Sequence, residues 1–416
     1  MKSPYIYYTC FFLCYLFTSA PAGAEQPFDS PATFRASEIL PPELAKGPNH
    51  WVDEAVANDG YLNMYTIRSD YGDVQAVSTA KLRKYVHEIN AVARMREIQG
   101  SDEFKKGMAE KAGDVVEGAQ GLISDPVGTV SSTISGVGKL FSRAGENLVG
   151  GSRSETEGSR MESLLGYAKA KRDIGYQFGV DVYSHNKILQ DELTSLAGAS
   201  GTGTLVMSGL LMAVPGGAGV AVSVAGGTEL MENVMRDQAP ADLRKMNRGR
   251  LAAMGVDQHV ADIFIANGTY TPREQTFLVA ALDNMANTSN RAEFIKFATL
   301  TDNPDIAFFR QRQAQMYAAY HRTIEPVDSF VSIGEISTAR TKSGKIVFNV
   351  PLDYLIWTKN MAAVASIITQ NVARMEGISG REIWVTGTMS PLARESISKM
   401  GWTVHDQAQS KLSLPE

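Results

Sequence analysis

One serine and one lysine have the spacing that can create a nucleophile. Ser78 and Lys81 fit a Ser-x-x-Lys pattern at the start of a predicted helix. The lysine would lie one turn beyond the serine and could activate its hydroxyl for attack on an acyl group. A serine in this position is equally suited to cap the helix.

Two further tripeptides follow in the chain. Ser184-His185-Asn186 matches Ser-x-Asn, and Lys342-Ser343-Gly344 matches Lys-Thr/Ser-Gly. The order of the three patterns is similar to that of penicillin-binding proteins and serine β-lactamases. The resemblance implies a periplasmic serine hydrolase that uses Ser78 and Lys81. In that family the last pattern lies on a strand, whereas we predict a hairpin turn for residues 342–344.

Metal and nucleotide patterns are incomplete. His87-Glu88 begins like a zinc-protease helix, but Ala91 stands where the second histidine ligand is required. Gly201-Thr202-Gly203 begins like a dinucleotide loop, but Val206 replaces its third glycine. We therefore predict no metal and no cofactor.

Composition narrows the class of protein further. The chain has 40 Lys and Arg against 45 Asp and Glu, a net charge of −5. This balance disfavours a nucleic-acid partner, because binding to phosphates requires concentrated positive charge. The hydrophobic fraction of 44% excludes a mainly disordered chain.

The first 24 residues are typical of a secretory signal. Lys2 precedes an apolar run from Tyr5 to Phe17, and Ala22-Gly23-Ala24 has the small-x-small form of a cleavage site. Both cysteines lie in the apolar run, so cleavage near Ala24 would leave a chain without disulfides. We expect an exported protein that is periplasmic or envelope-associated.

The elements that would position these residues divide into several regions. Residues 25–48 are a polar lead-in. Within 49–149, an antiparallel meander over Trp51–Val77 precedes a helix from Ser78 or Thr79, a second helix over Asp102–Ala112, and a Gly-rich amphipathic stretch over 113–149. Residues 150–160 form a Gly/Ser-rich linker.

Residues 161–323 are predicted to be helical. Thr271, Pro272 and Glu274 form a capping-box signature, and Asp305–His321 is a further long helix. Residues 324–416 form a small α/β module of order β-β-α-β-α-β. Its strands cover Ser329–Ile336, Lys345–Val350, Glu382–Thr386 and Trp402–His405, and its helices cover Leu352–Met375 and Pro391–Met400. The last two strands are expected to be parallel.

Residues 193–228 contain no charged side chain. Pro215-Gly216-Gly217 divides this segment into two arms, each short for a membrane span. Two interpretations remain open: a hairpin buried in the protein and a hairpin in contact with a membrane. A locally basic helix follows it, with Arg244, Lys245, Arg248 and Arg250, and would suit anionic headgroups.

The sequence thus predicts an α+β, predominantly helical protein. It has a small N-terminal meander, a helical centre with an apolar Gly-rich hairpin, and a C-terminal α/β module. The functional hypothesis is a non-enzymatic envelope or periplasmic protein that acts by contact with a membrane surface or an envelope protein partner. The alternative is the serine hydrolase with Ser78 and Lys81.

Overall fold

A computed structural model of the chain describes residues 28–30, 32–102, 104–105, 155–199 and 229–414. The signal segment 1–24, the Gly-rich stretch 113–149, nearly all of the predicted helix 102–112 and residues 200–228 of the apolar segment lie outside these ranges. The α+β, predominantly helical class is confirmed, with antiparallel strands at the N-terminus and a second sheet at the C-terminus.

The N-terminal strands form one antiparallel sheet. Its members are β1 (Thr33–Arg35), β2 (Trp51–Val52), β3 (Ala55–Asn58), β4 (Asn63–Arg68) and β5 (Val74–Val77). They follow the order β1-β3-β4-β2, and β5 also pairs with β4. The predicted meander is thus confirmed. The predicted lead-in 25–48 contains β1 and two short helices, α1 (Ala36–Ile39) and α2 (Pro42–Ala45), so part of it belongs to this sheet.

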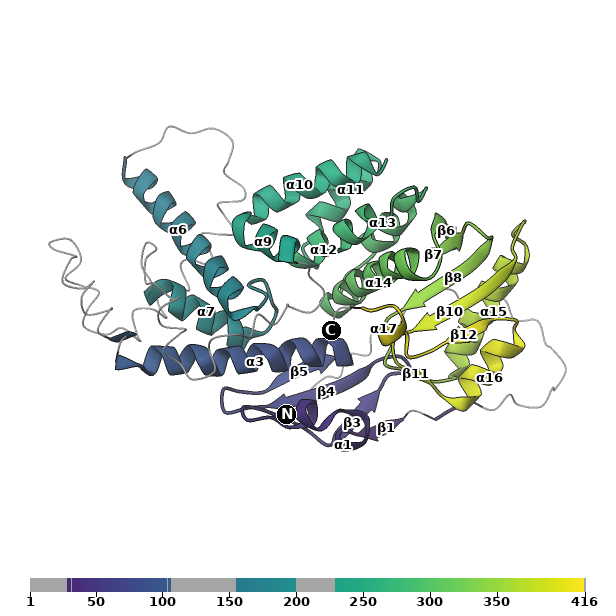
Figure 1. Cartoon of the computed structure of the whole chain (residues 1–416), viewed down its shortest axis with the longest axis horizontal. Helices are drawn as coiled ribbons and strands as arrows, with labels where there is room; N and C mark the ends of the chain where they lie inside the picture. The colour runs from purple at the N-terminus through teal and green to yellow at the C-terminus, as the bar shows by residue number, and fades with distance from the viewer. Residues whose placement is uncertain (1–27, 31, 103, 106–154, 200–228, 415–416) are drawn as a thin grey trace, which may run out of the picture.

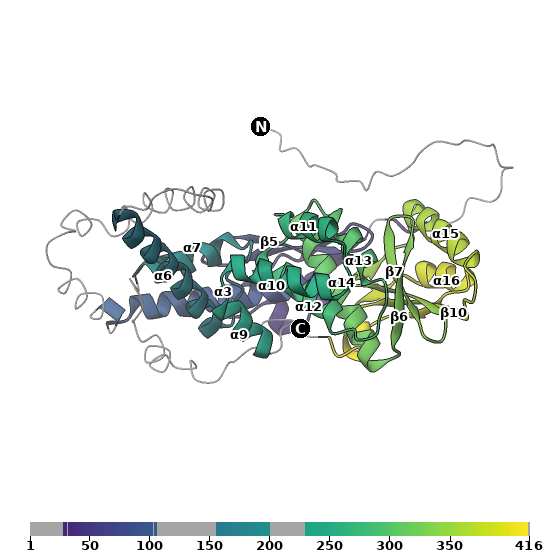
Figure 2. The ribbon, with the colours of Figure 1, turned by 90° about the horizontal axis from the view of Figure 1, so that it is seen from above.

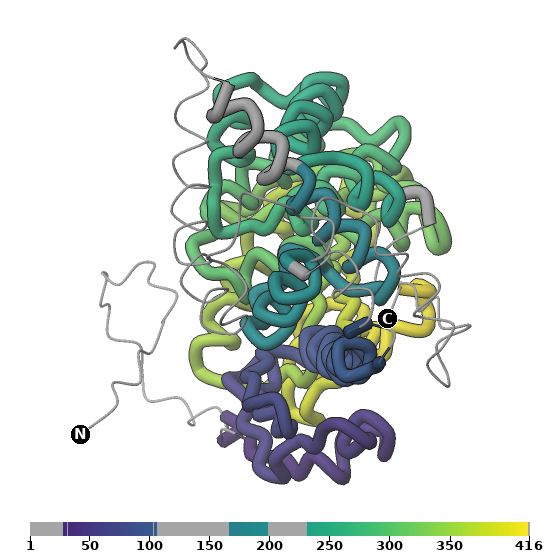
Figure 3. The backbone as a smooth tube through the Cα atoms, turned by 90° about the vertical axis from the view of Figure 1, so that its left-hand side faces the viewer, coloured from purple at the N-terminus to yellow at the C-terminus, as the bar shows by residue number. Residues whose placement is uncertain are grey.

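Helix α3 (Thr79–Gly100) follows directly from β5 and starts where the sequence predicts. Its first half buries Leu82, Val86 and Ile89 among residues of the N-terminal sheet. Its second half buries Val92 and Met95 among residues of the central helices. The helix therefore lies between the N-terminal sheet and the helical region, as Figure 3 shows in end-on view.

The central region is helical where it is described. Its helices are α6 (Glu155–Phe178), α7 (Lys187–Ala199), α9 (Glu229–Asp237), α10 (Pro240–Ala253), α11 (Gln258–Ala266), α12 (Pro272–Asp283), α13 (Arg291–Thr299) and α14 (Pro304–Thr323). Because α6 begins at Glu155, the second half of the predicted linker 150–160 is helical instead. The helices form a layer beside the C-terminal sheet, as Figure 2 shows from above.

Helix α12 begins with the predicted capping box. The Thr271 hydroxyl accepts a hydrogen bond from the Glu274 amide at 3.1 Å, and the Glu274 carboxylate accepts one from the Thr271 amide at 2.8 Å. Pro272 occupies the first helical position, where an amide hydrogen is not needed. This cap places Arg273 and Glu274 at the buried end of the helix.

Replacing Thr271 with alanine is expected to lower the free energy of unfolding by about 1 kcal/mol, because a buried helix amide loses its acceptor. Urea unfolding followed by circular dichroism measures this loss. Thr323→Ala is the matched control, because the Thr323 hydroxyl only donates to the carbonyl of Ala319 at the end of α14. Equal losses in the two variants would contradict a capping role.

The C-terminal module is a five-stranded mixed sheet of order β12-β10-β8-β7-β6. Its members and the adjoining elements are β6 (Val327–Ile333), β7 (Ile336–Thr341), β8 (Lys345–Val350), β9 (Tyr354–Leu355), α15 (Lys359–Ala373), β10 (Gly380–Val385), β11 (Thr388–Met389), α16 (Pro391–Lys399), β12 (Thr403–His405) and α17 (Ala408–Lys411). Strands β10 and β12 are parallel, as predicted.

Two predictions for this module need correction. The strand predicted over Ser329–Ile336 is a hairpin of β6 and β7, because the chain turns at Gly334, whose φ is +62°. The helix predicted from Leu352 begins only at Lys359, after the short strand β9. Helix α14 covers one face of the sheet, whereas α15 and α16 cover the other.

A partly buried aspartate of the C-terminal module joins that module to the N-terminal sheet and to α3. The Asp353 carboxylate accepts hydrogen bonds from the amide of Asn63 at 2.9 Å and from the amide of Thr79 at 3.0 Å. Burial raises the pKa of Asp353 to about 6. The C-terminal module therefore fixes the first turn of α3, which positions the side chains of that helix.

Candidate functional site

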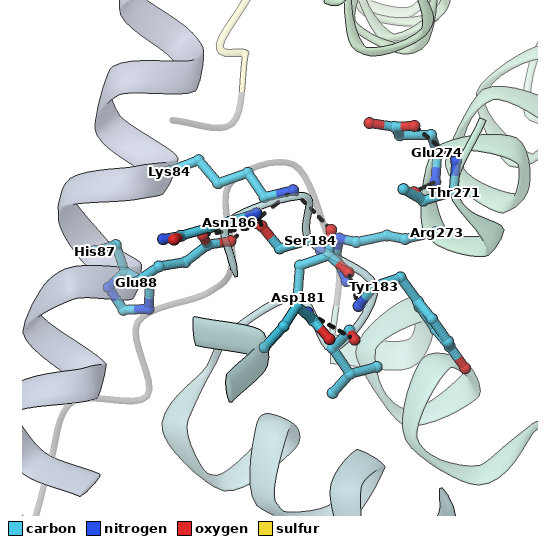
Figure 4. Close-up of polar contacts among 12 residues, drawn as sticks. Lys84, His87, Glu88, Asp181, Tyr183, Ser184, Asn186, Thr271, Arg273 and Glu274 are labelled. Atoms are coloured by element: carbon cyan, nitrogen blue, oxygen red, sulfur yellow. Dashed lines mark hydrogen bonds and ion pairs between the residues drawn. The ribbon is translucent and has the colours of Figure 1, made fainter. Parts of the chain in front are cut away.

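A group of charged side chains, all buried except Lys84, whose side chain is 12% exposed, lies where three elements meet. Lys84 and Glu88 come from α3, Asp181 from the loop between α6 and α7, and Arg273 and Glu274 from the start of α12. Figure 4 shows the side chains of α3 and of α12 extending toward this loop from opposite sides. We call these five residues the ion cluster.

The centre of the ion cluster is the Lys84 ammonium. It lies 2.7 Å from the Asp181 carboxylate and 4.0 Å from that of Glu88. Burial alone would lower the pKa of Lys84, but Asp181, Glu88 and Glu274 outweigh burial and raise it. Burial would likewise favour a neutral Asp181, but Lys84 and Arg273 lower the pKa of that carboxyl. This pair is therefore an ammonium and a carboxylate at neutral pH.

Glu88 is less well compensated. Only 1% of its surface is exposed, and one carboxyl oxygen accepts a hydrogen bond from the Ser184 hydroxyl at 2.9 Å. Its other oxygen is buried and receives no hydrogen bond. Burial raises the pKa of Glu88 to about 7 even though Lys84 is near. Glu88 therefore changes its protonation state close to neutral pH.

Arg273 connects the ion cluster to α9. Its guanidinium forms two hydrogen bonds with the Glu232 carboxylate, at 2.6 and 2.9 Å, and lies 4.1 Å from the centre of the Phe277 ring. Burial would lower the pKa of Arg273, but Glu232, Asp181 and Glu88 raise it. Burial raises the pKa of Glu274. The cluster thus ties together α3, α9, α12 and the loop.

Local backbone chemistry places the loop. Gly179 ends α6 with a φ of +63°, and its carbonyl accepts a hydrogen bond from the ring of His87 on α3 at 2.9 Å. Gly175 packs so closely against the loop that an added Cβ would lie 2.0 Å from the Val182 side chain. Asp181 then accepts a hydrogen bond from the Tyr183 amide at 2.9 Å, which fixes the turn.

Within the described residues, the space beside the ion cluster is small. The neighbouring cavity, between Asp181, Tyr183 and Arg273, has a volume of about 20 Å³, enough for one water molecule. The buried Tyr183 hydroxyl also has no hydrogen-bond partner there. The chemistry that this arrangement allows is proton uptake and release by Glu88.

The structure gives Ser78 a capping position with an unusual backbone. Its hydroxyl accepts a hydrogen bond from the Lys81 amide at 3.2 Å, and its φ and ψ are +92° and +149°. Residues other than glycine rarely adopt this conformation, which stores strain. The Ser78 amide bonds to the Asn63 carbonyl and its carbonyl accepts from the Leu82 amide, each at 2.9 Å, so neighbouring elements hold the strained backbone.

Lys81 is paired with an acid. Its ammonium lies 2.5 Å from the Asp305 carboxylate of α14, and its side chain is 6% exposed. An ammonium held in this way is poorly placed to remove a proton from serine. The catalytic assignment of Ser78 and Lys81 remains a prediction.

The other two tripeptides lie on different elements. Ser184 and Asn186 are in the α6–α7 loop, where Ser184 donates to Glu88, and Lys342-Ser343-Gly344 is the turn between β7 and β8. Within the described residues, no hydrogen bond or ion pair links Ser78, Ser184 and Lys342. The part of the chain that the structure describes also contains no group of three His, Cys, Asp or Glu residues placed to hold a metal ion.

The predicted basic helix is α10, and half of its positive charge is paired. Arg248 lies 2.8 Å from Asp262 and Arg250 lies 3.8 Å from Asp283. Arg244 and Lys245 are exposed. The surface of α10 is therefore less positive than its sequence indicates.

Sequence reasoning missed the ion cluster. Lys84 and Glu88 are four residues apart on α3, a spacing that usually marks an ion pair on a solvated helix face. Their partner Asp181 is distant in the chain, and its burial depends on the packing of α6 and α7. One local signal for part of the ion cluster was present in the sequence. The capping box at Thr271 fixes the orientation of the first turn of α12, which contains Arg273 and Glu274.

Comparisons with protein-family models, with curated proteins and with solved structures found no match.

Proposed function

We propose that the protein is a non-enzymatic envelope protein that contacts a membrane surface through its charge-free segment 193–228. The observation that carries this proposal is the sequence of that segment, which is long, apolar and rich in glycine between Glu192 and Glu229. Apolar segments of this length partition to a lipid interface or pack in a protein core.

The described helices support this proposal by the way they flank the segment. α7 and α9 stand before and after residues 200–228, and α3 and α6 flank the second Gly-rich stretch, within 106–154. α3, α6 and α7 share one apolar core, with Ile98, Phe178 and Leu193 among its members. The helices that flank both Gly-rich segments in the chain thus pack against one another (Figure 1).

The closed ion cluster also favours a non-enzymatic protein. Lys84 pairs with Asp181 and Glu88, Arg273 pairs with Glu232, and the adjacent cavity has the volume of about one water molecule. Among the helices in the described ranges, none is both long and apolar enough to cross a membrane.

Flotation with phosphatidylcholine vesicles tests the proposal. The full chain is expected to float with the vesicles, and a Leu210→Glu/Val214→Glu variant is expected to stay in the dense fraction, because charges in the segment oppose burial in lipid. Leu300→Glu is the matched control, because Leu300 is a surface leucine that is 60% exposed. Wild-type protein that remains in the dense fraction would contradict the membrane proposal and favour contact with a protein partner.

The alternative function is a serine hydrolase, and the strained backbone of Ser78 is the observation that favours it, because such strain is frequent at catalytic residues. Labelling with a fluorescent penicillin and with a fluorophosphonate probe tests it. A hydrolase would label in the wild type and lose the label in Ser78→Ala. An unlabelled wild type, or equal labelling of the variant, removes this alternative.

A further inference from the structure

One face of α3 holds the loop between α6 and α7 (Figure 4). Lys84 pairs with Asp181 of the loop at 2.7 Å. One turn further along α3, Glu88 accepts a hydrogen bond from the Ser184 hydroxyl at 2.9 Å. The Ser184 oxygen in turn accepts a hydrogen bond from the backbone amide of Asn186 at 3.2 Å. The positions of Ser184 and Asn186 therefore depend on their contact with Glu88.

The loop has a tightly packed part and a part that covers Glu88. In the first part, Gly175 of α6 lies so close that an added Cβ would be 2.0 Å from the Val182 side chain. Residues 184–186 lie beyond this contact, and His185 in their middle is exposed to solvent. Residues 184–186 are therefore the part of the loop that can move without breaking its packing against α6.

The contact between the loop and Glu88 leaves two buried polar groups unpaired. Asn186 is 1% exposed, and its side-chain oxygen accepts a hydrogen bond from the Ile188 amide at 3.1 Å. Within the described residues, neither its side-chain nitrogen nor the second oxygen of Glu88 has a hydrogen-bond partner. Unpaired buried polar groups lower stability, and both groups would gain partners if water entered.

The charges around Glu88 only partly compensate its carboxylate. The charged and titratable groups near Glu88 and its partner Lys84 come from three elements: Lys84 and Tyr85 of α3, Asp181 of the loop, and Arg273 and Glu274 of α12. Lys84 is shared, because it lies 2.7 Å from Asp181 and 4.0 Å from Glu88. Lys84 and Arg273 lower the pKa of Asp181, so its carboxylate stays ionised and repels that of Glu88.

From these contacts we propose that residues 184–186 form a pH-sensitive latch over Glu88, closed while the Glu88 carboxyl is protonated and opening as it ionises. Helix α7 begins directly after the latch, at Lys187, and carries the first residues of the charge-free segment 193–228. The latch is thus a conformational device at the base of that segment. It does not depend on the membrane contact proposed above.

Proton linkage gives the direction of the change. Burial raises the pKa of Glu88 to about 7 in the closed form, from an ordinary value of 4.5. Opening of the latch returns the carboxyl to water, where it loses its proton more readily. The closed form therefore binds the proton more tightly, and rising pH favours the open form. Local openings of this kind expose backbone amides to exchange with solvent.

Hydrogen–deuterium exchange of the full chain, followed by mass spectrometry of peptides that cover residues 183–190, tests the latch. Exchange rates are divided by the intrinsic rates at each pH. The open fraction of the wild type is expected to rise at least fivefold from pH 5.5 to 8.5. Glu88→Gln is expected to rise less than twofold, because glutamine has no proton to lose. Glu97→Gln, which removes an exposed acid from the same helix, is expected to keep the wild-type rise.

A second variant changes the latch itself. Ser184→Ala removes the hydroxyl that donates to Glu88, which makes the buried carboxylate less stable. The rise of the open fraction with pH is therefore expected to be larger in this variant than in the wild type. If Glu88→Gln does not fold, Ser184→Ala decides, and a rise equal to or smaller than that of the wild type contradicts the proposal.

Two histidines near the loop also titrate, and Glu88→Gln separates their effect from that of Glu88. His87 bonds to the Gly179 carbonyl, His185 lies in the latch, and burial lowers the pKa of both. The proposal is overturned if the wild-type open fraction does not change with pH, or if Glu88→Gln shows the wild-type rise. It is also overturned if the loop exchanges as slowly as the amides that pair β8 with β10, because opening would then be global unfolding.

Discussion

Lys84→Met is expected to lower the free energy of unfolding by roughly 3–5 kcal/mol. The substitution keeps a side chain of similar length but removes the only cation within 4.0 Å of both Asp181 and Glu88 among the described residues. Asp181 would then be a buried carboxylate that has lost its 2.7 Å partner. Uncompensated charge in a buried site is among the largest single sources of destabilisation in proteins.

Urea unfolding followed by far-ultraviolet circular dichroism measures the effect, because the helices joined by the ion cluster dominate this signal. The control is Lys187→Met, which removes a cation from the exposed pair of Lys187 and Asp191, whose side chains are 83% and 64% exposed. Exposed pairs of this kind contribute little, so the control is expected to change stability by less than about 0.5 kcal/mol.

A double variant separates lost charge compensation from lost packing. Asp181→Asn in the Lys84→Met background removes the unpaired carboxylate and is expected to restore part of the lost stability. If the double variant is less stable than Lys84→Met alone, the charge argument is wrong. If Lys84→Met behaves like the exposed control, the ion cluster does not hold the helices together.

Local chemistry made some elements predictable from the sequence. The capping box at Thr271 and the start of α3 beside Ser78 depend on residues within one turn, so their patterns were sufficient. The apolar face of α3 follows from the helical spacing of Leu82, Val86 and Ile89, all of which are buried. The parallel pairing of β10 with β12 followed from the helix between them.

Elements defined by distant contacts were not predictable. β1 has three residues and pairs with β3, so no alternating pattern could reveal it. The turn at Gly334 interrupts a run of strand-forming residues, and only the pairing of β6 with β7 shows that the run folds back.

The same limit applies to the candidate sites. Ser78 and Lys81 were singled out by spacing, but the cation of Lys81 pairs with Asp305, a residue of α14 far along the chain. Glu88 drew no notice as a buried acid in the sequence, because its burial and its hydrogen bond from Ser184 depend on a loop far along the chain. Spacing identifies residue types that could react, whereas burial and partners decide which of them are free to do so.

Glu88→Gln is expected to change how stability depends on pH. In the unfolded chain Glu88 loses its proton near its ordinary pKa of 4.5, whereas burial in the folded protein raises this pKa to about 7. Between these values the folded state binds more protons than the unfolded state, so the free energy of unfolding falls as pH rises. The contribution of Glu88 is fully present below about pH 4.5 and is lost as pH passes 7; it is on the order of 3 kcal/mol.

Glutamine keeps an oxygen that can accept the hydrogen bond of Ser184 but carries no proton to lose. The variant should therefore have the same free energy of unfolding as the wild type near pH 4.5. At pH 8 its free energy of unfolding should be higher than that of the wild type by up to about 3 kcal/mol. The difference between the two unfolding curves, measured by urea from pH 4.5 to 8, removes the contributions of other groups such as Asp353, whose pKa burial also raises, to about 6.

Glu97→Gln is the matched control, because Glu97 lies on the same helix and is exposed. It removes the same carboxylate at a position away from the ion cluster. A flat curve for Glu88→Gln, or a variant that is less stable than the wild type at pH 8, would show that Glu88 is ionised in the folded protein without cost. In that case the carboxylate pair around Lys84 would be fully compensated, and the ion cluster would not respond to pH near neutrality.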